Sequence, residues 1–182
     1  MKSVKSLVSI AKVGYAGAGW YDYVGGQLRD YCADMGWDYD VYIDLMAITS
    51  PRVHVTRNIR VAAELYVTRV MPKSIIRSVH TSYANYVAGK GIAGVKTGPF
   101  AAALKGCTDS VVLDVYMARA ANIPQTWLSD RKSVHAELTR RIRKAGKIVG
   151  LCPRDCQAAI WAGQRHLEGW NPSIPDIRKI LS

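Results

Sequence analysis

The chain has 182 residues, of which 49% are hydrophobic, so it is long and apolar enough to bury a core as a single domain spanning residues 1–182. This composition excludes a disordered chain, and no apolar run approaches the length of a membrane span. The formal net charge is +11, and residues 51–150 hold the excess, with seventeen Lys/Arg against five Asp/Glu. Such a concentration favours a phosphate-bearing partner, although a solvated basic face without a partner is the alternative.

The N-terminal region and the cysteines argue against secretion and against a metal site. Lys12 interrupts the short apolar run of residues 7–11, so no secretory signal is recognisable and a cytoplasmic protein is expected. The four cysteines have no zinc-binding spacing, and we expect free thiols and no bound metal. They are Cys32, Cys107, Cys152 and Cys156.

The periodicity of apolar residues predicts helices along nearly the whole chain. Apolar side chains recur every three or four positions over residues 20–35, and Gly36 ends that helix. Asp38 can cap a second helix, which the Ser50-Pro51 pair stops. Further helices are predicted over residues 56–70, 74–87, 100–105, 114–121, 130–149 and 153–166. The tail residues Ile174, Ile177, Ile180 and Leu181 are expected to pack back on the domain. The result is an all-α class.

A glycine-punctuated segment, residues 91–99, separates two of the predicted helices. Glycine allows the backbone to approach a phosphate closely, and the N-terminus of the following helix directs free N–H groups at it. Gly94, Gly98 and the Lys96-Thr97 pair fit an anion-binding turn of this kind. Alone the pattern is weak, because glycine-rich turns between helices are common.

The sequence after this turn carries a more specific pattern. Residues 92–98 read Ile-Ala-Gly-Val-Lys-Thr-Gly, and residues 112–120 read Val-Leu-Asp-Val-Tyr-Met-Ala-Arg-Ala. Together they resemble the helix-hairpin-helix (HhH-GPD) DNA glycosylase superfamily, of the endonuclease III and 8-oxoguanine glycosylase type. There an L-P-G-V-G-x-K-T-A hairpin precedes a V-D-x-H-(V/M) segment with an essential aspartate. Tyr116 stands where the family usually has histidine. The resemblance covers residues 91–121. A looser likeness, to small phage-encoded members, extends to residues 47–52, 58 and 157–161.

Two registers place the family's hairpin on this chain. The first matches Lys96-Thr97 to the family's K-T pair, and Lys96 then precedes Asp114 by 18 positions, as in the endonuclease III branch. The second matches residues 93–95 to P-G-V and puts Gly98 at the lysine position, which leaves an enzyme without a nucleophilic lysine, or no enzyme. We favour the first register.

The resemblance implies a compact helical DNA glycosylase fold and, with the first register, a possible AP-lyase step. Glycosidic cleavage builds positive charge on the deoxyribose, so a carboxylate beneath the sugar stabilises the transition state, and Asp114 is the candidate. Lys96 is the candidate nucleophile, provided that its amine is partly unprotonated. The expected base-pocket residues are Asn58, Tyr116, Gln157 and Trp161. The expected DNA-binding residues are Gly94, Val95, Thr97, Gly98, Arg52, Arg119, Arg140, Arg141 and Lys144.

Plainer interpretations stay open for these residues and for the function. Asp114 can simply cap a helix, Lys96 can bind phosphate without reacting, and Trp161 can belong to the core. The basic residues of 140–147 can be a solvated stripe. The expected partner is double-stranded DNA, modified or not, with no membrane partner and no cofactor; a phage-encoded protein would act in the host cytoplasm. The alternatives to a glycosylase are a non-catalytic helix-hairpin-helix protein that grips the DNA backbone and a glycosylase-related enzyme that processes hypermodified phage bases.

Overall fold

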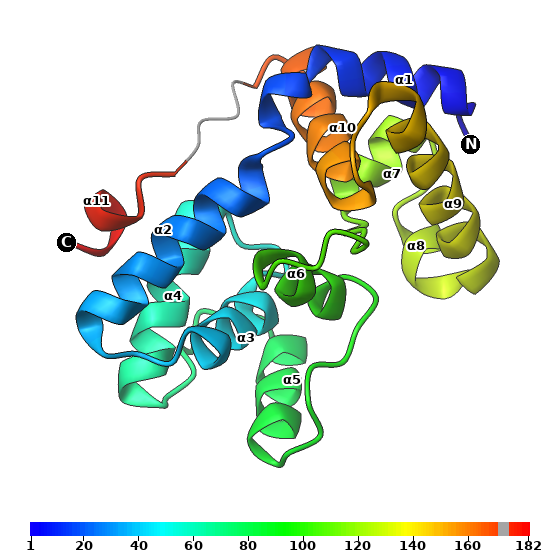
Figure 1. The fold of residues 1–182 in the computed structure, drawn as a ribbon. Coiled ribbons are helices and arrows are strands. Elements are labelled where there is room, and N and C mark those ends of the chain that lie inside the picture. Colours follow the sequence, from blue (N-terminus) through cyan, green and yellow to red (C-terminus); the bar gives the residue numbers. More distant parts are fainter. Residues whose placement is uncertain (171–174) are drawn as a thin grey trace.

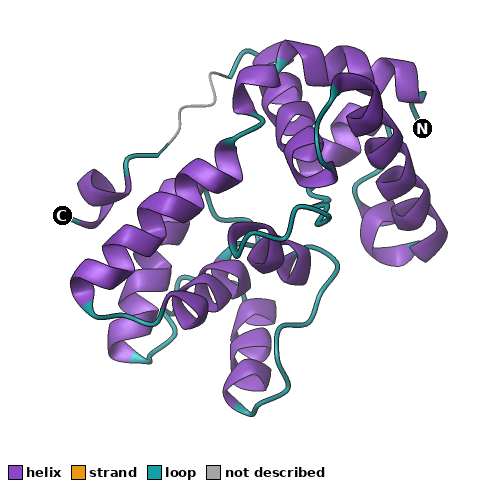
Figure 2. Ribbon diagram, viewed as in Figure 1, coloured by secondary structure: helices purple, strands orange, loops and turns teal. Residues whose placement is uncertain are grey.

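A computed structural model describes residues 1–170 and 175–182, and these residues form helices joined by loops (Figure 1). No strand occurs among them (Figure 2), so the predicted all-α class is confirmed. Ile174, expected to pack back on the domain, lies outside the described residues. The helices are α1 (Val4–Val13), η1 (Tyr15–Gly17), α2 (Trp20–Met35), α3 (Tyr39–Thr49), α4 (Val55–Thr68), α5 (Arg77–Val87), α6 (Thr97–Leu104), α7 (Val115–Ala121), α8 (Thr126–Asp130), α9 (Lys132–Val149), α10 (Pro153–Leu167) and α11 (Ile177–Leu181).

Several helix ends follow directly from capping residues. Gly36 adopts a left-handed conformation with φ of +66° and ends α2. The Asp38 carboxylate accepts a hydrogen bond from the Val41 N–H at 3.0 Å and starts α3. The Asp114 carboxylate accepts one from the Met117 N–H, also at 3.0 Å, and starts α7. These three predicted boundaries are confirmed.

Other boundaries differ from the prediction because backbone geometry decides them. The helix predicted over residues 130–149 is interrupted at Arg131, whose extended backbone separates α8 from α9. α4 ends at Thr68 because Arg69 is left-handed, with φ of +58°, so Val70 is exposed rather than on a buried face. α6 begins at Thr97 instead of residue 100, and α1, with the Ser3 hydroxyl as its cap, was not predicted.

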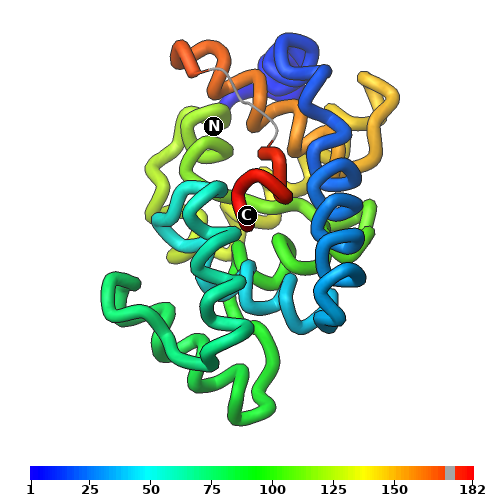
Figure 3. Tube along the Cα trace, turned by 90° about the vertical axis from the view of Figure 1, so that its left-hand side faces the viewer, coloured from blue at the N-terminus to red at the C-terminus, as the bar shows by residue number. Residues whose placement is uncertain are grey.

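The helices pack as two lobes with separate hydrophobic cores. The first lobe consists of α1, η1 and α7–α10, and the second of α2–α6 and α11. In the second lobe α11 packs against α2 and α4, which brings the C-terminal end of the chain onto helices from its first half (Figure 3). Ile177, on α11, is fully buried there, as expected of the tail. The chain thus leaves the first lobe after η1 and returns to it before α7.

The segment Val111–Leu113 links the two lobes. The side chains of Val111 and Leu113 belong to the core of the first lobe, and that of Val112 belongs to the core of the second. Alternation of this kind is what a non-helical, extended stretch produces, because successive side chains point to opposite sides. Both cores therefore hold the segment, and it ends at Asp114, at the junction of the lobes.

Close helix packing fixes the first lobe. A Cβ atom on Gly163 of α10 would lie 2.1 Å from the Ile10 carbonyl oxygen of α1, and one on Gly14 would lie 2.1 Å from the Gly163 nitrogen. Only glycine allows the two backbones to approach this closely. The same helix, α10, faces the second lobe with its other side chains, so this contact also positions part of the junction.

Candidate active site

A cavity of about 370 Å³ lies where the two lobes meet, within the size range of small-ligand pockets. The first lobe contributes side chains from the start of α7 and from α10, and the second from α2, α4, α6 and the turn between α3 and α4. The lining residues are Trp20, Tyr21, Ser50, Arg52, Val53, His54, Val55, Asn58, Lys96, Phe100, Val112, Asp114, Tyr116, Gln157, Ala158, Trp161 and Arg165.

Asp114 places a carboxylate in this cavity with both oxygens hydrogen-bonded. One oxygen accepts from the Met117 N–H, and the other accepts from the Trp161 indole N–H at 3.2 Å. Burial raises the pKa of Asp114 above its ordinary value, while these hydrogen bonds and the charge of Lys96 oppose the shift. The carboxylate is therefore fixed in orientation by donors from both α7 and α10.

Lys96 approaches the cavity from the other lobe, as the residue that precedes α6. Its ammonium group donates a hydrogen bond to the Ser50 carbonyl oxygen at 3.4 Å. Burial lowers the pKa of Lys96, and the nearby charge of Asp114 raises it in part. Within the described residues the two groups form no ion pair at 4.0 Å or less. An amine with a lowered pKa and a carboxylate thus line the same cavity without being paired with each other.

Aromatic rings form much of the cavity wall. The Trp20 ring lies 6.1 Å from the Trp161 ring and 6.5 Å from the Phe100 ring, measured between centroids. The Tyr116 ring meets Trp161 edge-on at 6.0 Å. Trp161 is partly buried, and it both packs against the core of the first lobe and lines the cavity. Rings of this kind can stack on a planar ligand.

Two amide side chains lie deep in the cavity and are almost fully buried. The Thr49 hydroxyl donates to the Asn58 amide oxygen at 2.7 Å, and the Tyr21 hydroxyl donates to the Gln157 amide oxygen at 2.9 Å. Asn58 also donates to the Met46 carbonyl oxygen at 2.9 Å. Among the described residues, the Gln157 amide nitrogen has no partner, so it is free to donate to a ligand.

The glycine-punctuated turn enters the cavity through Lys96. Gly94 has φ of +126°, and a Cβ atom there would lie 2.7 Å from the Thr97 hydroxyl oxygen. That hydroxyl donates to the Ala93 carbonyl oxygen at 2.6 Å and closes the turn. Val95 is exposed, and a Cβ atom on Gly98 would meet nothing within 4 Å. The turn therefore requires glycine at 94, whereas Gly98 leaves open space at the start of α6.

The predicted basic residues are divided between the cavity and the rest of the surface. Arg52 lies at the cavity, exposed and in a left-handed conformation with φ of +59°. Arg119 pairs with Glu168 at 2.8 Å, outside the cavity lining. On α9, Arg140 and Arg141 both pair with Glu137 at 2.7 Å, and Lys144 is exposed. Arg141 also donates to the Lys2 carbonyl oxygen at 2.6 Å, so it holds the N-terminal segment. None of these α9 residues lines the cavity.

Several lining residues were not predicted from the sequence. Trp20, Tyr21 and Phe100 were interpreted only as parts of amphipathic or short helices. Arg165 was not singled out, although it follows Gln157 and Trp161 at intervals of four and therefore shares their helix face. That spacing is the signal that could have identified it.

These observations define an all-helical, two-lobed protein with an aspartate and a lysine in an aromatic-walled cavity between the lobes. The chain belongs to the DUF7178 family, described as a family of unknown function, whose model matches residues 10–167. That range includes every residue that lines the cavity. No curated protein and no solved structure matches the chain. In the described part of the chain, no helix has the length and hydropathy needed to cross a membrane, and no group of three or more His, Cys, Asp or Glu side chains is placed to hold a metal ion.

Proposed function

We propose that the protein is a DNA glycosylase of the helix-hairpin-helix type, which excises a damaged or modified base after the nucleotide has left the double helix. One observation carries the proposal. A single cavity is lined by Asp114, by Lys96 and by all four residues expected to hold a base, although they come from distant parts of the sequence. A carboxylate and an amine that line one cavity beside aromatic rings suit cleavage of a bond between a sugar and a planar base.

The cavity walls suit recognition of an everted base. The base stacks against the rings of Trp20, Trp161 or Tyr116, and the Gln157 amide nitrogen donates a hydrogen bond to an acceptor on its edge. Asn58 is held by Thr49 and Met46, so it shapes the cavity floor more than it offers free hydrogen-bonding groups. Tyr21 keeps its proton, because burial raises its pKa, and so holds the Gln157 amide oxygen.

Asp114 and Lys96 divide the chemistry of the proposed reaction. As the bond between sugar C1′ and the base nitrogen breaks, the base leaves with the electron pair and takes up a proton. The Asp114 carboxylate stabilises the positive charge left on the sugar. The neutral Lys96 amine attacks C1′, loses a proton, and after ring opening is joined to the sugar as an iminium ion. Because burial favours the neutral amine, it also favours this step.

DNA reaches the cavity along the turn before α6 in this proposal. Gly94 and the exposed Val95 lie next to Lys96, and the Thr97 and Gly98 N–H groups at the start of α6 have no acceptor within the described residues, as an anion-binding turn of the helix-hairpin-helix type requires. α5 and α6 both pack on α3, with residues 88–96 as the connection between them. Arg52 adds an exposed positive charge at the cavity.

Base release from defined duplexes tests the proposal. Duplexes that each carry one lesion or modified base, including 8-oxoguanine, thymine glycol, uracil and 5-hydroxymethyluracil, are incubated with the protein and the free base is measured. Asp114→Asn should lower release at least about 100-fold while DNA binding is retained. Binding without release from any duplex contradicts the proposal and favours the non-catalytic DNA-binding alternative.

Borohydride trapping tests the role of Lys96. Reduction of the iminium ion links protein and DNA permanently, and we expect this adduct to disappear in Lys96→Gln. Lys90→Gln is the matched control, because Lys90 is an exposed lysine of the same connecting segment. An adduct that persists without Lys96 would show that another amine reacts and would contradict the role given to Lys96. Base release by the wild-type protein without any adduct would favour the register in which Gly98 takes the lysine position.

A further inference from the structure

Arg165 is a buried cation that the proposed reaction does not use. Its side chain is 9% exposed and lies at the cavity between the lobes. Among the described residues, its Nε atom has no hydrogen-bond partner and its guanidinium group forms no ion pair. Removing a permanently charged group from water without a counter-charge is unfavourable. Such a group therefore indicates a place for an anion from outside the chain.

Aromatic rings hold the guanidinium group but do not neutralise it. Its central carbon lies 4.6 Å from the Trp161 ring centroid and 5.4 Å from that of Tyr116. These cation–π contacts orient the group and offset part of its desolvation. They involve ring faces, so they leave the planar N–H donors available, and those donors match the oxygen spacing of a phosphate group.

A second anion-attracting feature faces Arg165 from the other lobe. A smaller recess of about 40 Å³ adjoins the guanidinium group, and Val55 and Thr56, the first residues of α4, line it. His54 precedes α4 and makes no capping hydrogen bond with its side chain, and in the described structure the Val55 and Thr56 N–H groups have no acceptor. The N-terminus of this long helix carries partial positive charge, which favours an anion.

The charges around the cavity agree with an anionic ligand. Lys96, Arg52 and Arg165 line it, and Asp114 is the only carboxylate among the lining residues. No acidic side chain lines the smaller recess. Arg165 lies over the face of the Trp161 ring, whereas Asp114 accepts a hydrogen bond from the indole N–H at the edge of the same ring, so an anion at Arg165 does not need to displace the proposed catalytic carboxylate.

We propose that Arg165, together with the N-terminus of α4, binds a phosphate group of the nucleotide whose base occupies the cavity. That the phosphate belongs to the nucleotide in the cavity rests on the proposed function. The anion site itself is inferred from the N-terminus of α4 and from Arg165, which is unpaired among the described residues. Two sources carry the same chemistry: a DNA phosphodiester beside the everted nucleotide, and the phosphate of a free nucleotide.

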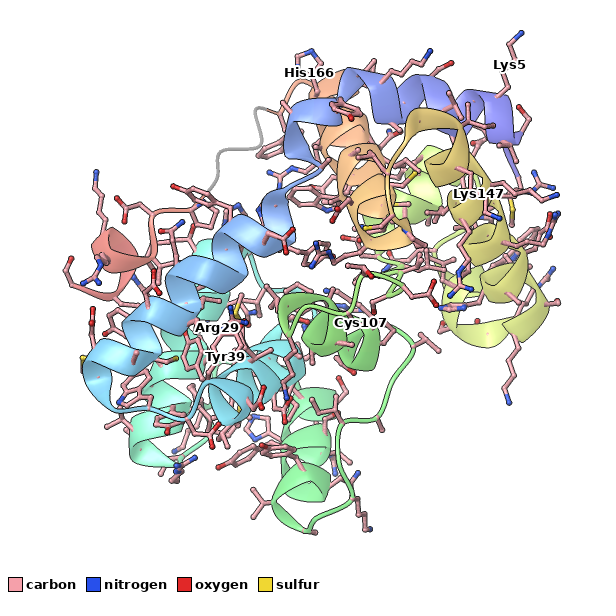
Figure 4. The ribbon with its side chains drawn as sticks, in the orientation of Figure 1. Lys5, Arg29, Tyr39, Cys107, Lys147 and His166 are labelled. Carbon is pink, nitrogen blue, oxygen red and sulfur yellow. The ribbon has the colours of Figure 1, made fainter. Side chains whose placement is uncertain are left out.

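Binding measurements with and without the phosphate charge test this proposal. The probes are inorganic phosphate, a deoxynucleoside 5′-monophosphate, and a duplex with one abasic-site analogue whose neighbouring phosphates are replaced singly by uncharged methylphosphonate. Arg165→Met should weaken binding of the responsible probe at least about ten-fold. Arg29→Gln is the matched control. It removes an equal charge from an arginine that also packs on a ring, that of Tyr39 at 4.7 Å, in the second lobe (Figure 4).

The pattern of affinities identifies the source. If one methylphosphonate weakens binding by the wild-type protein but not by Arg165→Met, the phosphate belongs to the DNA backbone. If the monophosphate depends on Arg165 and no methylphosphonate matters, it belongs to a free nucleotide. The proposal is overturned if Arg165→Met binds every probe as tightly as Arg29→Gln does. If Arg165→Met weakens binding of a probe but the wild-type protein releases no base from any duplex, the glycosylase proposal is refuted and the anion-site proposal is retained.

Discussion

The pKa values of Lys96 and Asp114 reflect two opposing effects on charged residues in a partly buried cavity. Burial moves the pKa of each toward its neutral form, and their mutual attraction moves both back. The motif spacing placed both residues at one site from the sequence alone. Helical spacing from Gln157 and Trp161 could have placed Arg165 at the same site, but its unpaired state depends on which side chains surround it in the folded protein. A residue's type can be recognised in a sequence, but the absence of its partner cannot.

Replacing Lys96 should stabilise the protein. We expect Lys96→Met to raise the free energy of unfolding by about 1 kcal/mol at neutral pH, since methionine fills similar space without a buried charge. Because the pKa of Lys96 is lower in the folded protein, the unfolded chain binds more protons, and wild-type stability rises with pH. The difference should therefore shrink as pH approaches 10.5, the ordinary value. Urea unfolding at several pH values measures it. An equal gain in Lys90→Met would contradict the explanation.

The decline of base release at acidic pH should follow the protonation of Asp114. The proposed mechanism needs this group ionised, and its pKa is raised by burial, so activity should already decline above pH 3.8, the ordinary value for aspartate. Single-turnover release across an acidic pH series measures the midpoint. The stability of Asp114→Asn serves as a control, because asparagine keeps the cap of α7 and should change unfolding by less than about 1 kcal/mol. A midpoint below 3.8 would remove Asp114 from this role.

At the scale of the helices, the helix boundaries that were predicted correctly are those set by capping residues. α2, α3 and α7 begin or end at residues whose side chains or conformations do the capping, and these are visible in the sequence. The break between α8 and α9 was missed because Arg131, which has an extended backbone there, is neither glycine nor proline and so gives no signal of a helix end. α1 was missed because its short apolar run was considered only as a possible signal segment. Its burial depends on α9 and α10, which come much later.

The contact of α1 with α10 leaves no room for a Cβ atom at Gly163, so adding one should destabilise the protein. Gly163→Ala places a Cβ atom 2.1 Å from the Ile10 carbonyl oxygen, and backbone atoms cannot rotate away. We expect a loss of about 1–3 kcal/mol in unfolding free energy, with a lower Tm. Gly26→Ala is the matched control, because it lies inside α2 with nothing within 4 Å of the added atom and should be neutral or stabilising. Equal losses in both variants would mean that glycine acts through helix propensity rather than through packing.

Across the whole molecule, the net charge overstates the positive charge that is free to meet a phosphate, because acidic side chains already pair with part of it. The sequence places most of the excess in residues 51–150, yet Glu137 pairs with both Arg140 and Arg141, and Asp109 pairs with Arg143 at 2.6 Å. Lys147, on the same helix, lies on the first lobe (Figure 4). The Glu137 pairs have the i,i+3 and i,i+4 spacing of helix neighbours and can be anticipated from the sequence, but the Asp109–Arg143 pair needs coordinates, because its partners lie far apart in the sequence.

The salt dependence of DNA binding should distinguish these groups. For a protein that releases counterions from DNA, the slope of log K against log salt becomes shallower by about one for each phosphate that the protein no longer neutralises. We expect Arg52→Gln to reduce the slope by about one, because Arg52 is exposed at the cavity and makes no ion pair within the described residues. Arg140→Gln should change it much less, since Glu137 already compensates that charge. Titrations of a fluorescent duplex at several salt concentrations measure both slopes. The reverse order would place the DNA on α9.

The route of the chain through the two lobes also sets an order of assembly. α1 packs on α7, α9 and α10, and the whole of α2–α6 lies between them in the sequence. On a translating ribosome, α1 emerges before every helix that can cover its apolar face. Helices α2–α6 of the second lobe can pack together while Leu7 and Ile10 are still in solvent, and α1 can dock fully only after α10 has emerged. Docking of α1 requires the close contact between Gly163 and Ile10. The first-translated and the last-translated helices of the first lobe therefore complete that lobe together.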